Sequence, residues 1–336
     1  MYKRFFRAFC LGILIYFLFV PNSASKINTI ERVANINIKN ISKLNSDRLP
    51  LPDSIPHPNG IAVTNGSMYV GSVTTGAVAK IDLQTSKSEL LVEPQTAIIA
   101  SNSLRADEAR GILWACSPDV FPKETKRQPS TLVALDLDNG TVINRIALPQ
   151  DGFCNDLAID DRGGVLVTDS FNPRILYLPP NESEFEVWLR DESWGVDKGL
   201  GLSGVGLSGI AISLDKTVYV GMFTSGQLYR IQDRQVEPIQ LSRQIVNPDG
   251  MAVAPDGSLI VCEGNYETGN GRLLQISLAE NLTGEINILA EGLDSPVNLS
   301  LNSESIWLTE GRLRSLLRSE LNLPQPNSFW VRRVFL

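Results

Sequence analysis

Residues 247–278 read NPDGMAVAPDGSLIVCEGNYETGNGRLLQISL, and this stretch decides the fold. It contains three short apolar runs, Met251–Ala254, Ser258–Cys262 and Leu273–Leu278. Turn residues at 255–257 (Pro-Asp-Gly) separate the first two runs, and a glycine-rich connection separates the second from the third. Three short strands joined in this way are typical of an antiparallel meander.

The same strand-turn-strand layout recurs five more times along the chain. Each repeat has an apolar middle strand, and the six read MYVGSV, ILWACS, VLVTDS, VYVGMF, LIVCEG and IWLTEG. The period is about 45 residues, which indicates radial repetition of small sheets. We therefore predict an all-β fold, a six-bladed β-propeller of four-stranded antiparallel blades.

The chain divides into three segments. Residues 1–25 resemble a secretory signal peptide, because three basic residues precede the uncharged apolar run 8–20. This run suits a signal peptide and is short for a membrane span; an uncleaved anchor is the alternative. Residues 26–56 form a lead-in segment and residues 57–336 the propeller. Since a ring needs its ends joined, we expect the lead-in or the C-terminal FWVRRVFL to complete a blade.

The formal net charge is -7, and removal of the three basic residues of the signal lowers it to about -10. An acidic protein is a poor ligand for nucleic acid or anionic membranes and is compatible with cations. We expect a secreted or periplasmic protein with a small-molecule substrate, no nucleic-acid partner and no membrane contact after signal removal. The sequence does not predict an oligomeric state.

Three cysteines remain after the signal: Cys116, Cys154 and Cys262. Cys116 and Cys262 occupy the same position in two different repeats, which places them on separate sheets. We expect all three to be small buried hydrophobic residues. One disulfide or a reactive thiol is the alternative.

The residues just before the innermost strands of a propeller ring one mouth of its central channel. In the six repeats these positions are Asn59, Ser103 (approximately), Asn155, Ser208, Asp249 and Val297. Oxygen-bearing side chains with one carboxylate suit a hard cation such as Ca²⁺. Zinc is a poor fit, because the chain has one histidine and no cysteine at the mouth.

Three motifs resemble the blades of a known family. CNDLAID with VLVTDS, SGIAIS with VYVG, and NPDGMAVAPDGSLIVCEG are similar to the third, fourth and fifth blades of the senescence marker protein (regucalcin)/gluconolactonase family. LRADEARGILWACSPD fits the second blade of an exported bacterial subgroup. The resemblance covers residues 55–310 and implies a six-bladed propeller with lactonase-type activity.

In that family a Glu of the first blade, Asn of the third and fourth blades and Asp of the fifth surround one divalent metal. The Asp also serves as base or nucleophile. By position, Asn155 and Asp249 match the family, whereas Asn59 replaces the Glu and Ser208 replaces the fourth-blade Asn. One carboxylate in place of two should weaken Ca²⁺ binding, because ligand charge tunes affinity.

A local structural role is the alternative interpretation of the same residues. Asn or Asp before Gly also caps turns, and Asp156 and Asp169 lie near enough in the third blade to contribute. His57, at a strand entrance, is interpreted as a rim or substrate contact. Without a second histidine, a paraoxonase-like His dyad is excluded.

The first hypothesis is an exported hydrolase that depends on a divalent metal, most plausibly Ca²⁺, and acts on a small lactone or ester. Asp249 is the catalytic residue, and Asn155 and His57 contact the substrate. The metal ligands are Asn59, Asn155, Ser208 and Asp249. The alternative is a non-catalytic propeller that binds a ligand or partner protein at the same mouth with a degenerate metal site. A strictosidine-synthase-like condensing propeller is a third class.

Overall fold

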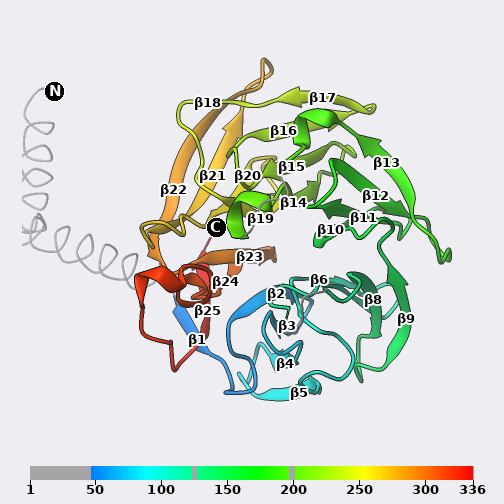
Figure 1. Cartoon of the computed structure of the whole chain (residues 1–336), viewed down its shortest axis with the longest axis vertical. Coiled ribbons are helices and arrows are strands. Elements are labelled where there is room, and N and C mark those ends of the chain that lie inside the picture. Colours follow the sequence, from blue (N-terminus) through cyan, green and yellow to red (C-terminus); the bar gives the residue numbers. More distant parts are fainter. Residues whose placement is uncertain (1–46, 123–126, 197–200, 336) are drawn as a thin grey trace, which may run out of the picture. The chain divides into compact units, whose positions relative to one another are not determined.

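The computed structural model describes residues 47–122, 127–196 and 201–335 (Figure 1). These residues form six sheets arranged around a common centre, which confirms the six-bladed β-propeller. Within these ranges, no helix is long and apolar enough to cross a membrane. The predicted signal peptide, residues 1–25, lies outside the described residues.

Blades one to four are four-stranded antiparallel meanders whose strands follow chain order from the centre outward. Blade one comprises β2 (Pro58–Val63), β3 (Ser67–Ser72), β4 (Val78–Asp82) and β5 (Ser88–Val92). Blade two comprises β6 (Ser103–Asp107), β7 (Ile112–Ser117), β8 (Thr131–Asp136) and β9 (Val142–Ala147). Blade three comprises β10 (Cys154–Ile159), β11 (Val165–Asp169), β12 (Arg174–Leu178) and β13 (Glu186–Arg190). Blade four comprises β14 (Leu207–Ile212), β15 (Val218–Met222), β16 (Leu228–Gln232) and β17 (Gln235–Pro238).

Blades five and six depart from this pattern. Blade five comprises β19 (Pro248–Val253), β20 (Leu259–Glu263), β21 (Gly271–Leu278) and β22 (Thr283–Leu293), and the short β18 (Gln240–Leu241) adds a fifth, parallel strand at its edge. Blade six comprises β23 (Pro296–Leu301), β24 (Ser305–Glu310), β25 (Trp330–Phe335) and β1 (Asp47–Pro50).

Both ends of the described chain close the ring. The C-terminal β25 is the third strand of blade six, and β1 of the lead-in segment pairs with it as the outermost strand, with Asp47 opposite Arg333 and Pro50 opposite Trp330. The expectation of a joined blade is confirmed, with each terminal segment giving one strand. The ring therefore has no unpaired terminal blade, and its two chain ends stabilise each other.

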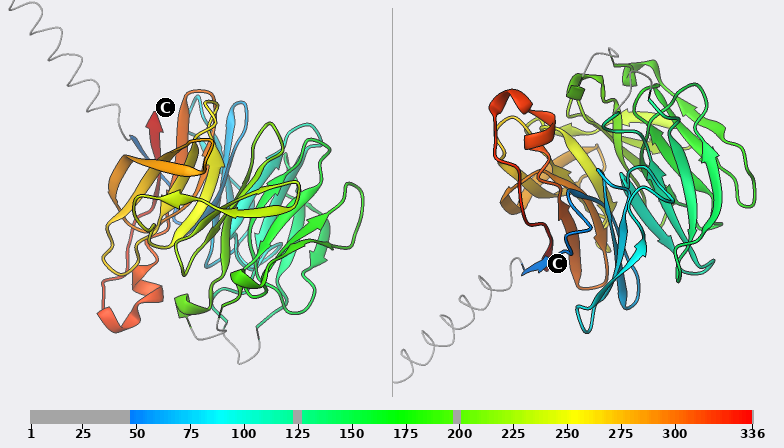
Figure 2. Two further views of the ribbon diagram at one scale, coloured as in Figure 1. Left: turned by 90° about the horizontal axis from the view of Figure 1, so that it is seen from above. Right: turned by 60° about the horizontal axis from the view of Figure 1, so that its bottom comes forward.

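Short helical turns occur only in the connections of the described chain. They are η1 (Glu192–Trp194), η2 (Gly201–Gly204), α3 (Arg314–Leu317) and η3 (Ser319–Leu321). Figure 2 shows η2, in green, and α3, in red, on the same face of the ring.

Buried carboxylates end the second strands of blades three, five and six. Asp169 forms a fully buried ion pair with Arg174 at 2.9 Å, and its Oδ1 accepts a hydrogen bond from the Phe153 backbone N–H. Equivalent pairs join Glu263 to Arg243 and Arg272, and Glu310 to Arg332. The acidic residues of the sequences TDS (168–170), CEG (262–264) and TEG (309–311) thus have a structural role in their blades, and this includes Asp169.

The structure corrects the expectation for the cysteines. Cys116, near the end of β7, forms a disulfide with Cys154, the first residue of β10, across a Cα–Cα distance of 5.2 Å. Cys262 is buried and free, as expected. Matching repeat positions correctly separates Cys116 from Cys262, but Cys116 faces the innermost strand of the next blade, where Cys154 lies. The disulfide therefore links blades two and three beside Asn155.

Candidate functional site at the channel mouth

Five of the six innermost strands begin with a β-bulge. The register shifts fall between Pro58 and Ile61, Cys154 and Leu157, Leu207 and Ile210, Pro248 and Met251, and Pro296 and Leu299. The strand β6 of blade two runs in regular register. Bulges re-aim side chains and are frequent beside active sites. The predicted mouth residues of five blades all lie inside these bulges.

Glycine follows three of the mouth residues because adjacent innermost strands approach closely there. A Cβ at Gly209 would lie 2.1 Å from the Asp249 carbonyl oxygen, and one at Gly250 would lie 2.6 Å from Asn298 Cα. Asp249 and Ser208 thus lie on strands that pack against their neighbours around the channel, which argues against the turn-capping interpretation.

A chain of carboxamides joins the mouth of blades one, two and three. The Asn59 side chain donates to Asn102 Oδ1 at 3.3 Å, and Asn102 donates to the Asn155 carbonyl oxygen at 2.8 Å and to its Oδ1 at 3.5 Å. Asn155 in turn donates to Ser170 Oγ at 2.7 Å. The structure therefore brings the predicted Asn59 and Asn155 together through Asn102.

Asn102 was not among the site residues predicted from the sequence. Blade two has no bulge and no residue-glycine motif at this position, so the repeat alignment points to Ser103, one residue further along. The only signal was the Asn itself, at the start of NSLRAD.

Below the mouth, a polar plug spans the channel between blades two, three and six. Asp156, 1% exposed, accepts hydrogen bonds from Ser103 Oγ at 2.5 Å and from the Leu157 and Ile210 backbone N–H groups. Arg105 forms an ion pair with Asp156 at 3.1 Å.

The Arg105 guanidinium also reaches the opposite side of the ring, where it donates to Asn298 Oδ1 at 3.2 Å. Asp156 is therefore a neutralised, fully hydrogen-bonded carboxylate with a structural role. The bulged position of blade six likewise contributes Asn298 to the plug.

Asp249 lies at the mouth in a different environment. It is partly buried, and its Oδ2 accepts one long hydrogen bond, 3.4 Å, from the hydroxyl of Tyr266, which is 2% exposed. Burial and the nearby negative charge of Asp156 raise the pKa of Asp249 to about 8, although the Tyr266 hydrogen bond lowers it. No ion pair to Asp249 occurs within the described ranges.

Two predicted site residues have partners away from the carboxamide chain. Ser208 is fully buried, and its hydroxyl donates to the carbonyl oxygens of Pro248 at 2.6 Å and Gly221 at 3.3 Å. The His57 ring is buried, lies 3.0 Å (Nδ1) from the Gly311 carbonyl oxygen and packs on Phe329. Burial lowers the pKa of His57. Their roles as metal ligand and substrate contact stay predictions.

An apolar cluster covers this face of the ring. It gathers side chains from the loops of five blades and from the turns η2 and α3: Val73, Ala100, Val120, Phe121, Leu202, Val205, Phe223, Tyr266, Val297, Leu313, Leu316 and Leu317. These loops and turns lie on one side of the ring (Figure 2). Tyr266 belongs to this cluster and donates to Asp249, so the carboxylate borders apolar side chains that disfavour its charged form.

The oxygen donors at the mouth are of the type that a hard cation prefers. Asn59, Asn155 and Asp249 present amide and carboxylate oxygens, the ligands that Ca²⁺ prefers. Among the described residues, Asp249 is the mouth carboxylate without an ion-pair partner, whereas Asp156 is paired with Arg105. Within the described ranges, no group of three or more His, Cys, Asp or Glu side chains could hold a metal ion. A cation here would depend on the carboxamides.

These features define a six-bladed β-propeller with one available carboxylate at a carboxamide-lined channel mouth. No family model matches the chain, and no curated protein matches it.

Solved structures share the fold. A protein provisionally named as a gluconolactonase has 13% identity and a TM-score of 0.59, covering 86% of this chain and 92% of its own. A luciferin-regenerating enzyme has 11% identity and a TM-score of 0.58, with 86% and 95% covered. Virginiamycin B lyase from Staphylococcus aureus has 13% identity and a TM-score of 0.56, with 87% and 99% covered. At identities this low the likeness establishes the fold alone.

Proposed function

We propose that this protein is an exported hydrolase that acts on a small lactone or ester at the channel mouth. The observation that carries the proposal is the contrast between its two central carboxylates. Asp156 is paired with Arg105 and accepts several hydrogen bonds, whereas Asp249 accepts a single hydrogen bond within the described residues, from the Tyr266 hydroxyl. A partly buried carboxylate without a salt bridge, next to apolar side chains, is suited to acid-base chemistry.

The reaction needs one proton acceptor and one group that holds the substrate. Ionised Asp249 would take a proton from a water molecule while the oxygen of that water bonds to the acyl carbon of the substrate. Collapse of the adduct breaks the acyl–oxygen bond, and Asp249 returns the proton to the leaving alcohol. A pKa raised to about 8 suits both steps near neutral pH. The Asn155 carboxamide would orient the ester, and Tyr266 would fix the carboxylate.

A divalent cation, preferably Ca²⁺, would be held by Asn59, Asn155 and Asp249, with Ser208 as the fourth predicted ligand. When bound, it would polarise the substrate carbonyl as a Lewis acid. We expect millimolar rather than micromolar affinity, because the site offers one carboxylate.

Export is part of the proposal and has one structural support. The Cys116–Cys154 disulfide is of the kind that persists in oxidising compartments and is rare in the cytosol.

A second candidate is a non-catalytic propeller that binds its ligand at the same mouth. The engagement of Ser208 with backbone carbonyls favours it, because one predicted ligand position is already satisfied within the protein.

Calorimetric titration with Ca²⁺, Mg²⁺ and Mn²⁺, followed by a lactone and ester screen, separates the two candidates. The proteins compared are the wild type, Asp249→Asn and the control Asp256→Asn, which changes an exposed turn aspartate of the same blade. The hydrolase account expects turnover and metal binding in the wild type and the control, both lost in Asp249→Asn. Ligand binding without turnover of any lactone or ester supports the second candidate.

A further inference from the structure

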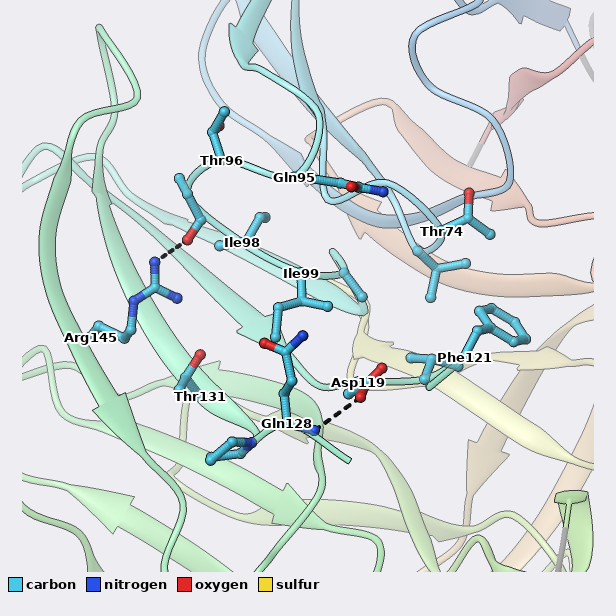
Figure 3. A pocket seen from close by; sticks show the side chains of 15 residues that line it. Thr74, Gln95, Thr96, Ile98, Ile99, Asp119, Phe121, Gln128, Thr131 and Arg145 are labelled. Atoms are coloured by element: carbon cyan, nitrogen blue, oxygen red, sulfur yellow. Dashed lines mark hydrogen bonds between the residues drawn. The ribbon is translucent and has the colours of Figure 1, made fainter. Parts of the chain in front are cut away.

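A pocket lies between blades one and two (Figure 3), and four of its lining residues, Val73, Ala100, Val120 and Phe121, belong to the apolar cluster described above. Its volume is about 810 Å³, within the usual range for small-molecule sites. One wall is the segment 95–100, which leads from β5 to β6, and the other is the β7–β8 connection at residues 119–121 and 128–129. We call this recess the interblade pocket.

The floor of the interblade pocket is polar and buried. Asp119, 9% exposed, accepts a hydrogen bond at Oδ2 from the Gln128 backbone N–H at 3.0 Å. Thr131 is 8% exposed, and its hydroxyl has no hydrogen-bond partner among the described residues. Buried hydroxyls are normally satisfied, and one without a partner destabilises the protein. A ligand hydroxyl that reached Thr131 would supply the missing bond.

The rim adds uncharged hydrogen-bonding groups and one cation. Its polar side chains are Thr74, Gln95, Thr96, Gln128 and Arg145. Figure 3 shows Gln95 and Thr96 on one wall, and Gln128 beside Asp119 on the other. The Arg145 guanidinium donates to the Ala97 carbonyl oxygen. The lining therefore carries one negative and one positive side chain, which disfavours a strongly charged ligand of either sign.

The wall formed by residues 95–100 is held in place by hydrogen bonds of its backbone. The Ile99 backbone N–H donates to Ser117 Oγ at 2.9 Å, and the Gln95 N–H donates to the Thr75 carbonyl oxygen at 2.8 Å. A preformed wall avoids the entropy loss of being ordered when a ligand binds.

We propose that the interblade pocket binds a neutral polyhydroxylated ring of monosaccharide size. The Asp119 carboxylate accepts hydrogen bonds from ring hydroxyls, and Thr131 and the carboxamides both donate and accept. Phe121 and Ile98, also in the lining, offer apolar surface to the C–H face of such a ring. The proposal stands on this lining and is independent of the hydrolase at the mouth.

The test is a calorimetric titration of the whole protein with D-glucose, D-galactose, D-xylose and their methyl glycosides. Choline and gluconate serve as charged probes. Thr131→Val removes the unpartnered hydroxyl at nearly constant shape, and Asp119→Asn removes the charge but keeps an acceptor for Gln128. Thr283→Val, at an exposed position of blade five, is the matched control.

Saturable binding of a neutral sugar, weakened about tenfold in Thr131→Val and in Asp119→Asn and unchanged in Thr283→Val, supports the proposal. Thr131→Val should unfold at or above the wild-type temperature, because it removes a buried hydroxyl that has no partner among the described residues, so misfolding does not account for its loss of binding. The proposal is overturned if no sugar binds, if both pocket variants bind like the wild type, or if a charged probe binds more tightly than every neutral sugar.

Discussion

Two aspartates, Asp156 and Asp249, lie in the bulges of the innermost strands of blades three and five. Asp156 is one position further along its bulge than Asp249. Asp156 forms an ion pair with Arg105 and accepts hydrogen bonds from the Ser103 hydroxyl and from two backbone N–H groups. Asp249 receives one long hydrogen bond from Tyr266. The same type of side chain thus forms part of a structural plug in blade three and, within the described residues, has no ion-pair partner in blade five.

Under the proposed function, Asp156 contributes to stability and Asp249 to the reaction. A saturated buried carboxylate holds the blades together, and an unsaturated one keeps the freedom to exchange a proton. The following changes break or sharpen the contrast, beginning with the largest expected effect.

Arg105→Met should give the largest loss of stability. It leaves Asp156 buried without its counter-ion, and breaking a buried pair in this way costs about 3–5 kcal/mol. The free energy of unfolding in guanidinium chloride measures the loss. Arg190→Met, which breaks an exposed pair with Glu192, is the matched control, with an expected loss below about 0.5 kcal/mol. Equal losses for both variants would show that the plug contributes no more than a surface pair.

Cys154→Ser should destabilise the side of the mouth that carries Asn155. Loss of a native disulfide typically costs about 2–4 kcal/mol. Thermal unfolding of the wild type and the variant, each with and without dithiothreitol, measures the effect. Reductant should lower the unfolding temperature of the wild type and leave that of Cys154→Ser unchanged. A wild type insensitive to reductant would contradict the link between blades two and three.

Asp249→Asn should stabilise the protein in alkaline solution. Because its folded pKa is about 8, Asp249 keeps a proton that the unfolded chain releases above its ordinary pKa of 3.8. Stability from this group is therefore complete below about pH 4 and lost as the pH rises to about 8.

The expected gain from Asp249→Asn at pH 8.5 is about 1–2 kcal/mol, after allowance for solvent screening of a partly exposed group. At pH 4 the gain should vanish. Unfolding temperatures at both pH values measure it. Asp256→Asn, whose carboxylate accepts hydrogen bonds from Ser258 that lower its pKa, should show the opposite sign at neutral pH. A gain for Asp249→Asn that is independent of pH would refute the account of its environment.

Tyr266→Phe should have the smallest effect. It removes one long hydrogen bond at constant volume and should cost about 0.5 kcal/mol. Because that bond lowers the pKa of Asp249, its loss should move the pH-dependent stability change to higher pH. The unfolding temperature, measured between pH 5 and 10, reports the shift. A move to lower pH would mean that Tyr266 does not donate to Asp249.

The fold could be predicted from the sequence because each blade repeats its own local signals. Alternating apolar strands and Asp-Gly turns recur at a regular period, so the assignment of each blade is supported by the same pattern in the others. The sequence did not decide whether the lead-in or the C-terminal segment closes the ring, since β1 and β25 carry no repeat signature of their own.

The site was predictable only in part. Asn59, Asn155 and Asp249 follow from position in the repeat, but the partner of each side chain depends on the neighbouring blade. Asn102 lies where blade two lacks a bulge. Arg105 reaches two other blades from a strand whose sequence, SLRAD, looks like any half-exposed strand. The Cys116–Cys154 disulfide likewise depends on inter-blade contact rather than on cysteine spacing.

The central claim is that Asp249 is the reacting carboxylate, and hydrolysis kinetics test it most directly. Five- and six-membered sugar lactones and simple aryl esters, with and without Ca²⁺, would be followed by acid release in the wild type and Asp249→Asn. The account predicts turnover by the wild type and a loss of at least about 100-fold in the variant, as for removal of a general base. Absence of turnover in the wild type, or equal rates in the two proteins, would contradict it.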